Sequence, residues 1–220
     1  MTESNKVKIE PFLRNDQYNF LKRQVKIILQ AHAATQDQGV LDATRISAVE
    51  KVLELLPPLT DEQKQFVLNA AAISESLHAE RYLFEGREYV IPFPELSDSD
   101  IRALFPKAKK INIPELKKAD AKRMTYMSWN DIRSERKYII FPHRRGMTGW
   151  SGSFKPMARK GICAVCHGHT NIGLFMAVVK SGRETYTSRG NYICQSSETC
   201  NDTISSLQHI NDFIETLNKF

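Results

Sequence analysis

The sequence predicts an α+β protein, in which an N-terminal antiparallel helical bundle is followed by a mixed α/β domain. Two observations lead to this prediction. Up to about residue 90, apolar residues recur at steps of three and four, as on one face of an α-helix. Beyond Pro92 and Pro94, short segments rich in aromatic and β-branched residues alternate with turn residues, as in β-strands. We therefore expect a four-helix bundle over residues 1–90 and an α/β domain over residues 91–220.

The four helices of the bundle follow from apolar stripes and from residues that begin or end a helix. Residues 16–32 and 41–56 each form one apolar stripe, and Pro57 with Pro58 ends the second. Thr60 is the expected N-cap of a third helix, with Gln63 at the capping-box position. A fourth helix is expected over residues 76–85. The short connections favour antiparallel neighbours.

The second part is expected to contain strands and two helices. A short helix should end near Leu104, and aromatic-rich segments predict strands at residues 125–129, 137–143 and 148–154. Residues 171–194 predict a hairpin with its turn near Ser181 and Gly182. A last helix is expected over residues 201–220, with Asn201 or Asp202 as its cap. Its buried face would consist of Ile204, Leu207, Ile210, Ile214 and Leu217.

The composition is typical of a soluble globular protein. Hydrophobic residues make up 41% of the chain and charged residues 25%. No apolar run approaches the roughly 20 residues that span a bilayer, so no membrane partner is expected. The first residues lack the apolar segment of a signal peptide. We therefore expect a cytoplasmic protein, in a reducing compartment that disfavours structural disulfides.

The positive charge is concentrated in the middle of the chain. Residues 102–160 contain 16 Lys and Arg against 4 Asp and Glu, a net charge of +12, whereas the flanking segments are mildly acidic. Such a segment is compatible with a solvated charged face, and also with contact to an acidic protein surface or to nucleic acid. An RNA- or ribosome-binding zinc module that uses residues 102–160 is therefore an alternative function, with the ribosome or ribosomal RNA as partner.

All four cysteines lie in the last 60 residues, as two pairs. Cys163 and Cys166 are two residues apart between turn glycines, and Cys194 and Cys200 flank the end of a predicted strand and the start of a predicted helix. A knuckle, a hairpin and ligands at a helix start are typical of a treble-clef-like zinc finger. We expect the four thiolates to hold one structural Zn2+. His167 and His169 are alternative ligands. Because the four cysteines already complete the set, we expect both histidines to be exposed turn residues instead.

A closed four-thiolate site leaves zinc no open position for water, so it stabilises a fold and does not catalyse. One enzyme alternative is a zinc deaminase, because His78-Ala79-Glu80 and the first cysteine pair match its short motifs. That alternative would leave Cys194 and Cys200 without a role, and no proline precedes Cys163. No nucleophile elbow, phosphate loop or dinucleotide motif is present. We expect no enzymatic activity, no catalytic residue and no small-molecule substrate.

Several segments, in order over nearly the whole chain, resemble a known family. They are "DQYNF", "VIPFPEL", "FPKAKKINIPEL", "SWNDIRSERKYIIF", "KGICAVC" and "GNYICQSSETCN". Together they resemble the elongation factor G-binding proteins, the FusB-type fusidic-acid-resistance family, including the wide spacing of the second cysteine pair. The resemblance implies that the zinc-finger domain binds elongation factor G. It further implies that binding helps release the factor from ribosomes on which fusidic acid has trapped it, without any covalent step.

The resemblance also implies three partner-binding residues. Ile162 stands directly before the first cysteine, where the family has an aromatic residue, so apolar bulk is kept and the ring is lost. Arg189 keeps a basic charge before the glycine of the second cysteine motif, and Tyr192 is unchanged. Zinc would draw the knuckle and the strand end together, so we expect the three side chains on one rim. In a further alternative, the helical bundle contacts the partner instead.

Overall fold

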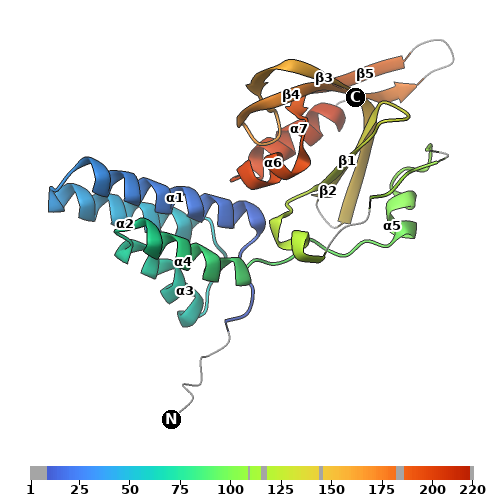
Figure 1. Cartoon of the computed structure of the whole chain (residues 1–220). Helices are drawn as coiled ribbons and strands as arrows, with labels where there is room; N and C mark the ends of the chain where they lie inside the picture. Colours follow the sequence, from blue (N-terminus) through green and yellow to red (C-terminus); the bar gives the residue numbers. More distant parts are fainter. Residues whose placement is uncertain (1–8, 109, 115–117, 144–145, 182–185, 219–220) are drawn as a thin grey trace. The chain divides into compact units, whose positions relative to one another are not determined.

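The computed structural model describes residues 9–108, 110–114, 118–143, 146–181 and 186–218. The chain divides into two compact units, Met1–Ile91 and Pro92–Phe220. The first is helical and the second is built on an antiparallel sheet (Figure 1). The predicted α+β class is confirmed. In the described part of the chain, no helix has both the length and the apolar character needed to cross a bilayer.

The first unit contains the four predicted helices. They are α1 (Asn15–Ala34), α2 (Gln38–Glu54), α3 (Asp61–Leu68) and α4 (Ser76–Glu88), with the 3-10 turn η1 (Asn69–Ala72) after α3. The predicted capping box is present at the start of α3: the Thr60 hydroxyl accepts from the Gln63 amide, and the Gln63 side chain accepts from the Thr60 amide. Asp37 caps α2 by accepting from the amides of Gly39 and Val40.

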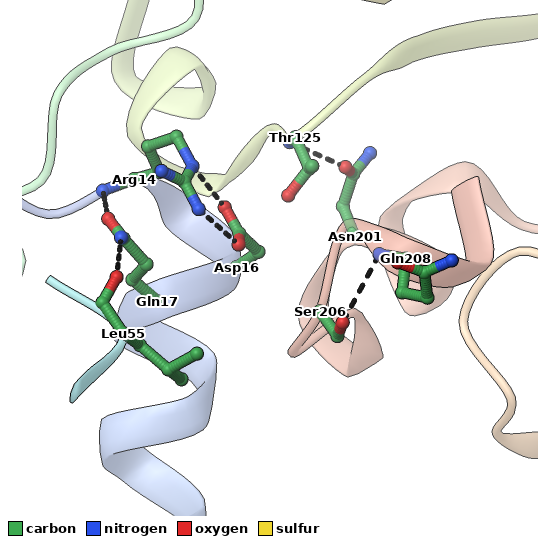
Figure 2. Close-up of polar contacts among 8 residues, drawn as sticks. All are labelled: Arg14, Asp16, Gln17, Leu55, Thr125, Asn201, Ser206 and Gln208. Atoms are coloured by element: carbon green, nitrogen blue, oxygen red, sulfur yellow. Dashed lines mark hydrogen bonds and ion pairs between the residues drawn. The ribbon is translucent and has the colours of Figure 1, made fainter. Parts of the chain in front are cut away.

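Buried polar side chains tie the start of α1 to the rest of the bundle. The Gln17 side chain accepts from the Arg14 amide and donates to the carbonyl oxygen of Leu55, 2.8 Å away (Figure 2). Arg14 also pairs with the nearly buried carboxylate of Asp16 at 2.9 Å. The apolar core of this unit includes the stacked rings of Phe66 and Tyr82. The bundle therefore has a core of its own.

The second unit has a five-stranded antiparallel sheet in the order β1-β2-β3-β4-β5. Its strands are β1 (Met127–Asp131), β2 (Arg136–His143), β3 (Gly146–Ile162), β4 (His169–Ser181) and β5 (Tyr186–Cys194). The short helix α5 (Asp98–Ala103) and the 3-10 helix η2 (Lys118–Arg123) precede them. The predicted hairpin is present as β4 and β5, and the expected turn position Gly182 lies outside the described residues.

Strand β3 is much longer than the predicted segment 148–154. It continues through Pro156 to Ile162, with a shift in its pairing to β4 between Pro156 and Lys160. This extension is largely exposed and carries charged residues, so it lacks the apolar alternation from which a strand is predicted. Backbone pairing with β4, rather than side-chain burial, holds it in the sheet.

The two faces of the sheet bury different cores. On β2, Ile139 and Phe141 contribute to the core that contains all four cysteines, whereas Tyr138 and Ile140 contribute to the core on α5. This division follows from the alternation of side chains along a strand. Helix α7 (Gln208–Asn218) lies against β4 and β5 on the cysteine side (Figure 1). The cysteine core is therefore closed between the sheet and the C-terminal helices.

The predicted single C-terminal helix is wrong. The chain forms two helices, α6 (Ser197–Thr203), capped by Ser196, and α7, with a non-helical backbone at Ile204 between them. The Ser206 hydroxyl accepts from the Gln208 amide at the start of α7 (Figure 2). Asn201 is not a cap but a buried residue inside α6. The expected apolar face is nevertheless used, because Ile204, Ile210, Ile214 and Leu217 are all buried.

Candidate metal centre

The four cysteines come together from three separate parts of the second unit. Cys163 and Cys166 lie in the turn after β3, Cys194 ends β5, and Cys200 lies in α6. All four are buried, and their Sγ atoms all lie within 4.8 Å of one another. Among the described residues, no histidine or carboxylate belongs to this group. His78, the histidine of the deaminase alternative, is exposed on α4 of the first unit.

The turn between Cys163 and Gly168 is shaped to present sulfur atoms. The amides of Val165 and Cys194 both point at the Cys163 Sγ, at 3.3 Å, and the Gly168 amide points at the Cys166 Sγ, at 3.4 Å. His167 adopts a left-handed backbone with φ of 54°, which closes the turn. Amide donors directed at sulfur stabilise thiolates over thiols. The backbone is therefore arranged for negatively charged sulfur.

The electrostatics of the cluster favour a bound cation. Hydrogen bonds from the thiols of Cys166, Cys194 and Cys200 hold the pKa of Cys163 far below its usual value. The interaction with Cys163 in turn raises the pKa of Cys194 and of Cys200 well above the usual range. The Cys163 thiolate therefore forms easily, whereas Cys194 and Cys200 resist ionisation beside it. A divalent ion removes this conflict, and four soft sulfur donors at mutual contact suit tetrahedral zinc.

Three buried polar side chains surround the cysteines, and sequence reasoning missed their roles. Asn201 accepts from the amides of Thr125 and Tyr126, at 2.7 and 3.1 Å, and thereby joins α6 to the start of β1 (Figure 2). Burial, followed by the charge of the neighbouring Cys200, raises the pKa of Tyr126 well above its usual value. Lys137 is fully buried on β2. Strand alternation places residue 137 on the same face as Ile139, so the burial of Lys137 could have been predicted from the sequence.

The structure brings two of the three predicted partner-binding residues to one region. Ile162 ends β3, is 58% exposed, and borders a surface hollow of about 280 Å³ that Thr216 of α7 also lines. Arg189 of β5 donates to the Thr216 carbonyl at 3.5 Å. Tyr192 is 37% exposed, but it lies three residues from Arg189 along the strand, so its side chain faces the other side of β5. Its carbonyl accepts from the Ala164 amide of the knuckle.

The two histidines considered as alternative ligands, His167 and His169, lie outside the sulfur cluster. His167 stacks on His209 at the start of α7, with 3.4 Å between ring centroids, and also lines the hollow beside Ile162. Burial, followed by the charge of His167, lowers the pKa of His209. His169 is exposed at the start of β4. The histidines therefore border the cysteine turn without joining the sulfur cluster.

Buried thiols on a knuckle, a hairpin and a following helix define a treble-clef zinc finger. Comparison with known proteins agrees: residues 98–215 match the family model "FBP C-terminal treble-clef zinc-finger", and residues 12–94 match "Elongation factor G-binding protein, N-terminal". The chain belongs to this family of elongation factor G-binding proteins. The family and the buried cysteine cluster together identify a single structural zinc as its cofactor.

A solved structure shares the fold over almost the whole chain. This structure, "Structure of the fusidic acid resistance protein FusC", superimposes with a TM-score of 0.82 at 24% sequence identity, and the match covers 93% of this chain and 97% of that one. No curated protein matches the sequence. At this identity, the likeness to the solved structure establishes the fold.

Proposed function

We propose that the protein binds elongation factor G through its zinc-finger unit, promotes release of the factor from the ribosome, and so protects translation from fusidic acid. The observation that carries this proposal is the match of the two family models, in order, to residues 12–94 and 98–215. The similar structure of a fusidic acid resistance protein supports the connection to the drug. Within this proposal, residues 1–90 and 91–220 act as separate domains in the cytoplasm.

The zinc has a structural part in this proposal. Cys163, Cys166, Cys194 and Cys200 each supply one ligand, which closes the coordination sphere and leaves no position for a substrate. The ion then holds the knuckle, the end of β5 and α6 together. The protein acts without enzymatic activity, because its effect needs a bound surface and no bond is made or broken.

Release follows from differential binding. A ligand shifts an equilibrium only by the difference in its affinity for the two states. If the protein binds elongation factor G more tightly in a conformation that fits the drug-locked ribosome poorly, binding favours dissociation. The basic segment 102–160 would speed the encounter with acidic surfaces and make association sensitive to salt.

The partner surface is proposed to include Ile162, Arg189 and Tyr192. Ile162 offers exposed apolar area beside a hollow, and Arg189 adds a guanidinium at the end of α7. Apolar, aromatic and arginine side chains are the usual anchors of protein interfaces. Because Tyr192 faces the other side of β5, the partner would have to wrap around this strand to touch all three.

Alanine substitution tests this surface. In calorimetric titrations with purified elongation factor G, Ile162→Ala, Arg189→Ala and Tyr192→Ala should each weaken binding about tenfold or more, as expected for interface anchors. Matched controls are Ile132→Ala, Arg133→Ala and Tyr186→Ala, which change exposed residues of the same types in the same unit. Controls should bind like the unsubstituted protein. Equal effects of test and control variants would refute the proposed surface.

The RNA alternative has one specific observation in its favour. A groove of about 620 Å³ is lined by Lys107, Lys110 and Arg136 together with the rings of Tyr138 and Trp150, and neither Asp nor Glu is among the described residues that line it. Cations and aromatic rings in one groove suit a nucleic-acid strand. No detectable binding to elongation factor G in the same titrations, together with an affinity for RNA that falls steeply with salt concentration, would establish this alternative instead.

A further inference from the structure

Lys137 is a charged side chain in the interior of the second unit. Its exposed fraction is 0%, and it lies on β2 on the face that carries Ile139 toward the cysteines. Lysine is almost never fully buried unless it is paired, because transfer of the ammonium group out of water costs a free energy on the order of several kcal/mol. The burial of Lys137 therefore requires a compensating negative charge.

The direct contacts of Lys137 do not provide that charge. Its Nζ donates to the Asn130 side-chain oxygen at 3.2 Å and to the Gln195 carbonyl at 3.1 Å, and lies 4.7 Å from the centroid of the Phe154 ring. An amide, a carbonyl and an aromatic ring stabilise an ammonium group but are neutral. Within the described part of the chain, Lys137 contacts no carboxylate.

The negative charge comes from the cysteines. Four thiolates around one divalent ion would leave the centre with two surplus negative charges. The cysteines belong to the same apolar core as Phe154, whose ring Lys137 contacts. Burial lowers the pKa of Lys137 to about 8, and the charges of Cys200, Cys194 and Cys163 oppose that shift. The lysine and the thiolates therefore stabilise each other's charged forms in the interior of the unit, where charges interact more strongly than in water.

Lys137 also holds the segment between the last two cysteines. Its partner Gln195 directly follows Cys194, and the Gln195 side chain donates to the carbonyls of Met157 and Ile172, at 2.8 and 2.9 Å. Gln195 is thus anchored on β3 and β4 by its side chain and on β2 by Lys137. This anchoring fixes the direction in which the chain leaves β5 toward α6 and Cys200.

We propose that Lys137 is the internal cation that balances the residual negative charge of the zinc tetrathiolate and positions the Cys194–Cys200 segment through the Gln195 carbonyl. This role rests on the proposed assignment of the four cysteines as zinc ligands. Outer groups that orient and tune the ligands of a metal centre typically change its affinity by about 10- to 100-fold when they are removed. Loss of Lys137 should therefore loosen the metal.

The test measures zinc release from the full-length protein to a colorimetric chelator, below the unfolding temperature. Lys137→Met keeps the apolar length and removes the charge, and should release zinc about tenfold faster or more. Lys155→Met changes an exposed lysine on β3 and should stay within about twofold of the unsubstituted protein. Lys137→Gln keeps a hydrogen-bond donor without the charge, so it separates the two parts of the role.

Each outcome supports or overturns the role of Lys137. Fast release from both Lys137 variants supports charge balance, whereas a normal rate in Lys137→Gln would refute it and leave only positioning. Normal rates in both variants, with a zinc-loaded unsubstituted protein, would overturn the inference but not the ligand assignment. A zinc-free unsubstituted protein would overturn both. If Lys137→Met does not fold, Lys137→Gln alone still distinguishes a normal release rate from a fast one.

Discussion

Removal of the zinc is expected to unfold the Pro92–Phe220 unit while the Met1–Ile91 unit stays folded. Through the ion, the four sulfur atoms join the turn after β3, the end of β5 and α6, and without it this link between the three segments is lost. Structural zinc in small fingers supplies about 10–16 kcal/mol of apparent binding free energy at neutral pH, which exceeds the stability of most domains. The first unit contains no cysteine and has its own core.

Hydrogen exchange followed by mass spectrometry resolves the two units in one experiment. After chelation, peptides from β4, β5 and α7 should lose protection, whereas peptides from α1 and α2 should keep it. Cys200→Ser should reproduce the loss, and His167→Asn should retain zinc, because His167 lies outside the sulfur cluster and asparagine tolerates its left-handed backbone. Unchanged protection in β4 and β5 after complete zinc removal would show that the metal does not hold this unit together.

Asn201→Leu is expected to destabilise the second unit by about 2–5 kcal/mol, because each buried unsatisfied group costs about 1–3 kcal/mol. The Asn201 side chain accepts from the buried amides of Thr125 and Tyr126 and donates to the Tyr126 carbonyl at 2.9 Å. Leucine has similar size but cannot accept a hydrogen bond from these amides. The same substitution also loosens α6, which carries Cys200.

Chemical denaturation of the zinc-loaded protein measures the change, with tryptophan fluorescence reporting on the second unit, which contains Trp129 and Trp150. The matched control is Asn211→Leu, at an exposed position on α7, which should change stability by less than about 0.5 kcal/mol. An equal, small effect of both substitutions would mean that the Asn201 hydrogen bonds contribute little to folding.

The elements that the sequence predicted well are those fixed by local chemistry. The apolar stripes of α1 and α2 and the capping box at Thr60 depend on residues within a few positions of one another, and the structure contains them. The cysteine cluster was also predictable, because the spacing of two thiol pairs implies a common ligand even when the pairs are far apart in the chain.

The features that were not predicted depend on distant partners. The extension of β3 beyond Phe154 is held in the sheet by pairing to β4. Its polar residues lack the alternation from which a strand is predicted, so the sequence did not indicate it. Asn201 in α6 bonds to the amides of Thr125 and Tyr126 just before β1, more than 70 residues away. The helical pattern of residues 201–220 carries no sign of this contact or of the break between α6 and α7. Lys137 is buried and its ammonium group contacts the carbonyl of Gln195, 58 residues away, so its role depends on the tertiary structure. The separation of Tyr192 from Arg189, by contrast, could have been predicted from the sequence, because residues three positions apart on a strand face opposite sides.

The proposed function is tested most directly by the dissociation of labelled elongation factor G from ribosomes stalled with fusidic acid. The zinc-loaded, full-length protein is added at increasing concentration and the dissociation rate is followed by fluorescence. We expect the rate to rise and saturate with protein concentration, and the effect to disappear for Cys200→Ser. A dissociation rate that stays unchanged at all protein concentrations would contradict the proposal that this protein frees the factor from the ribosome.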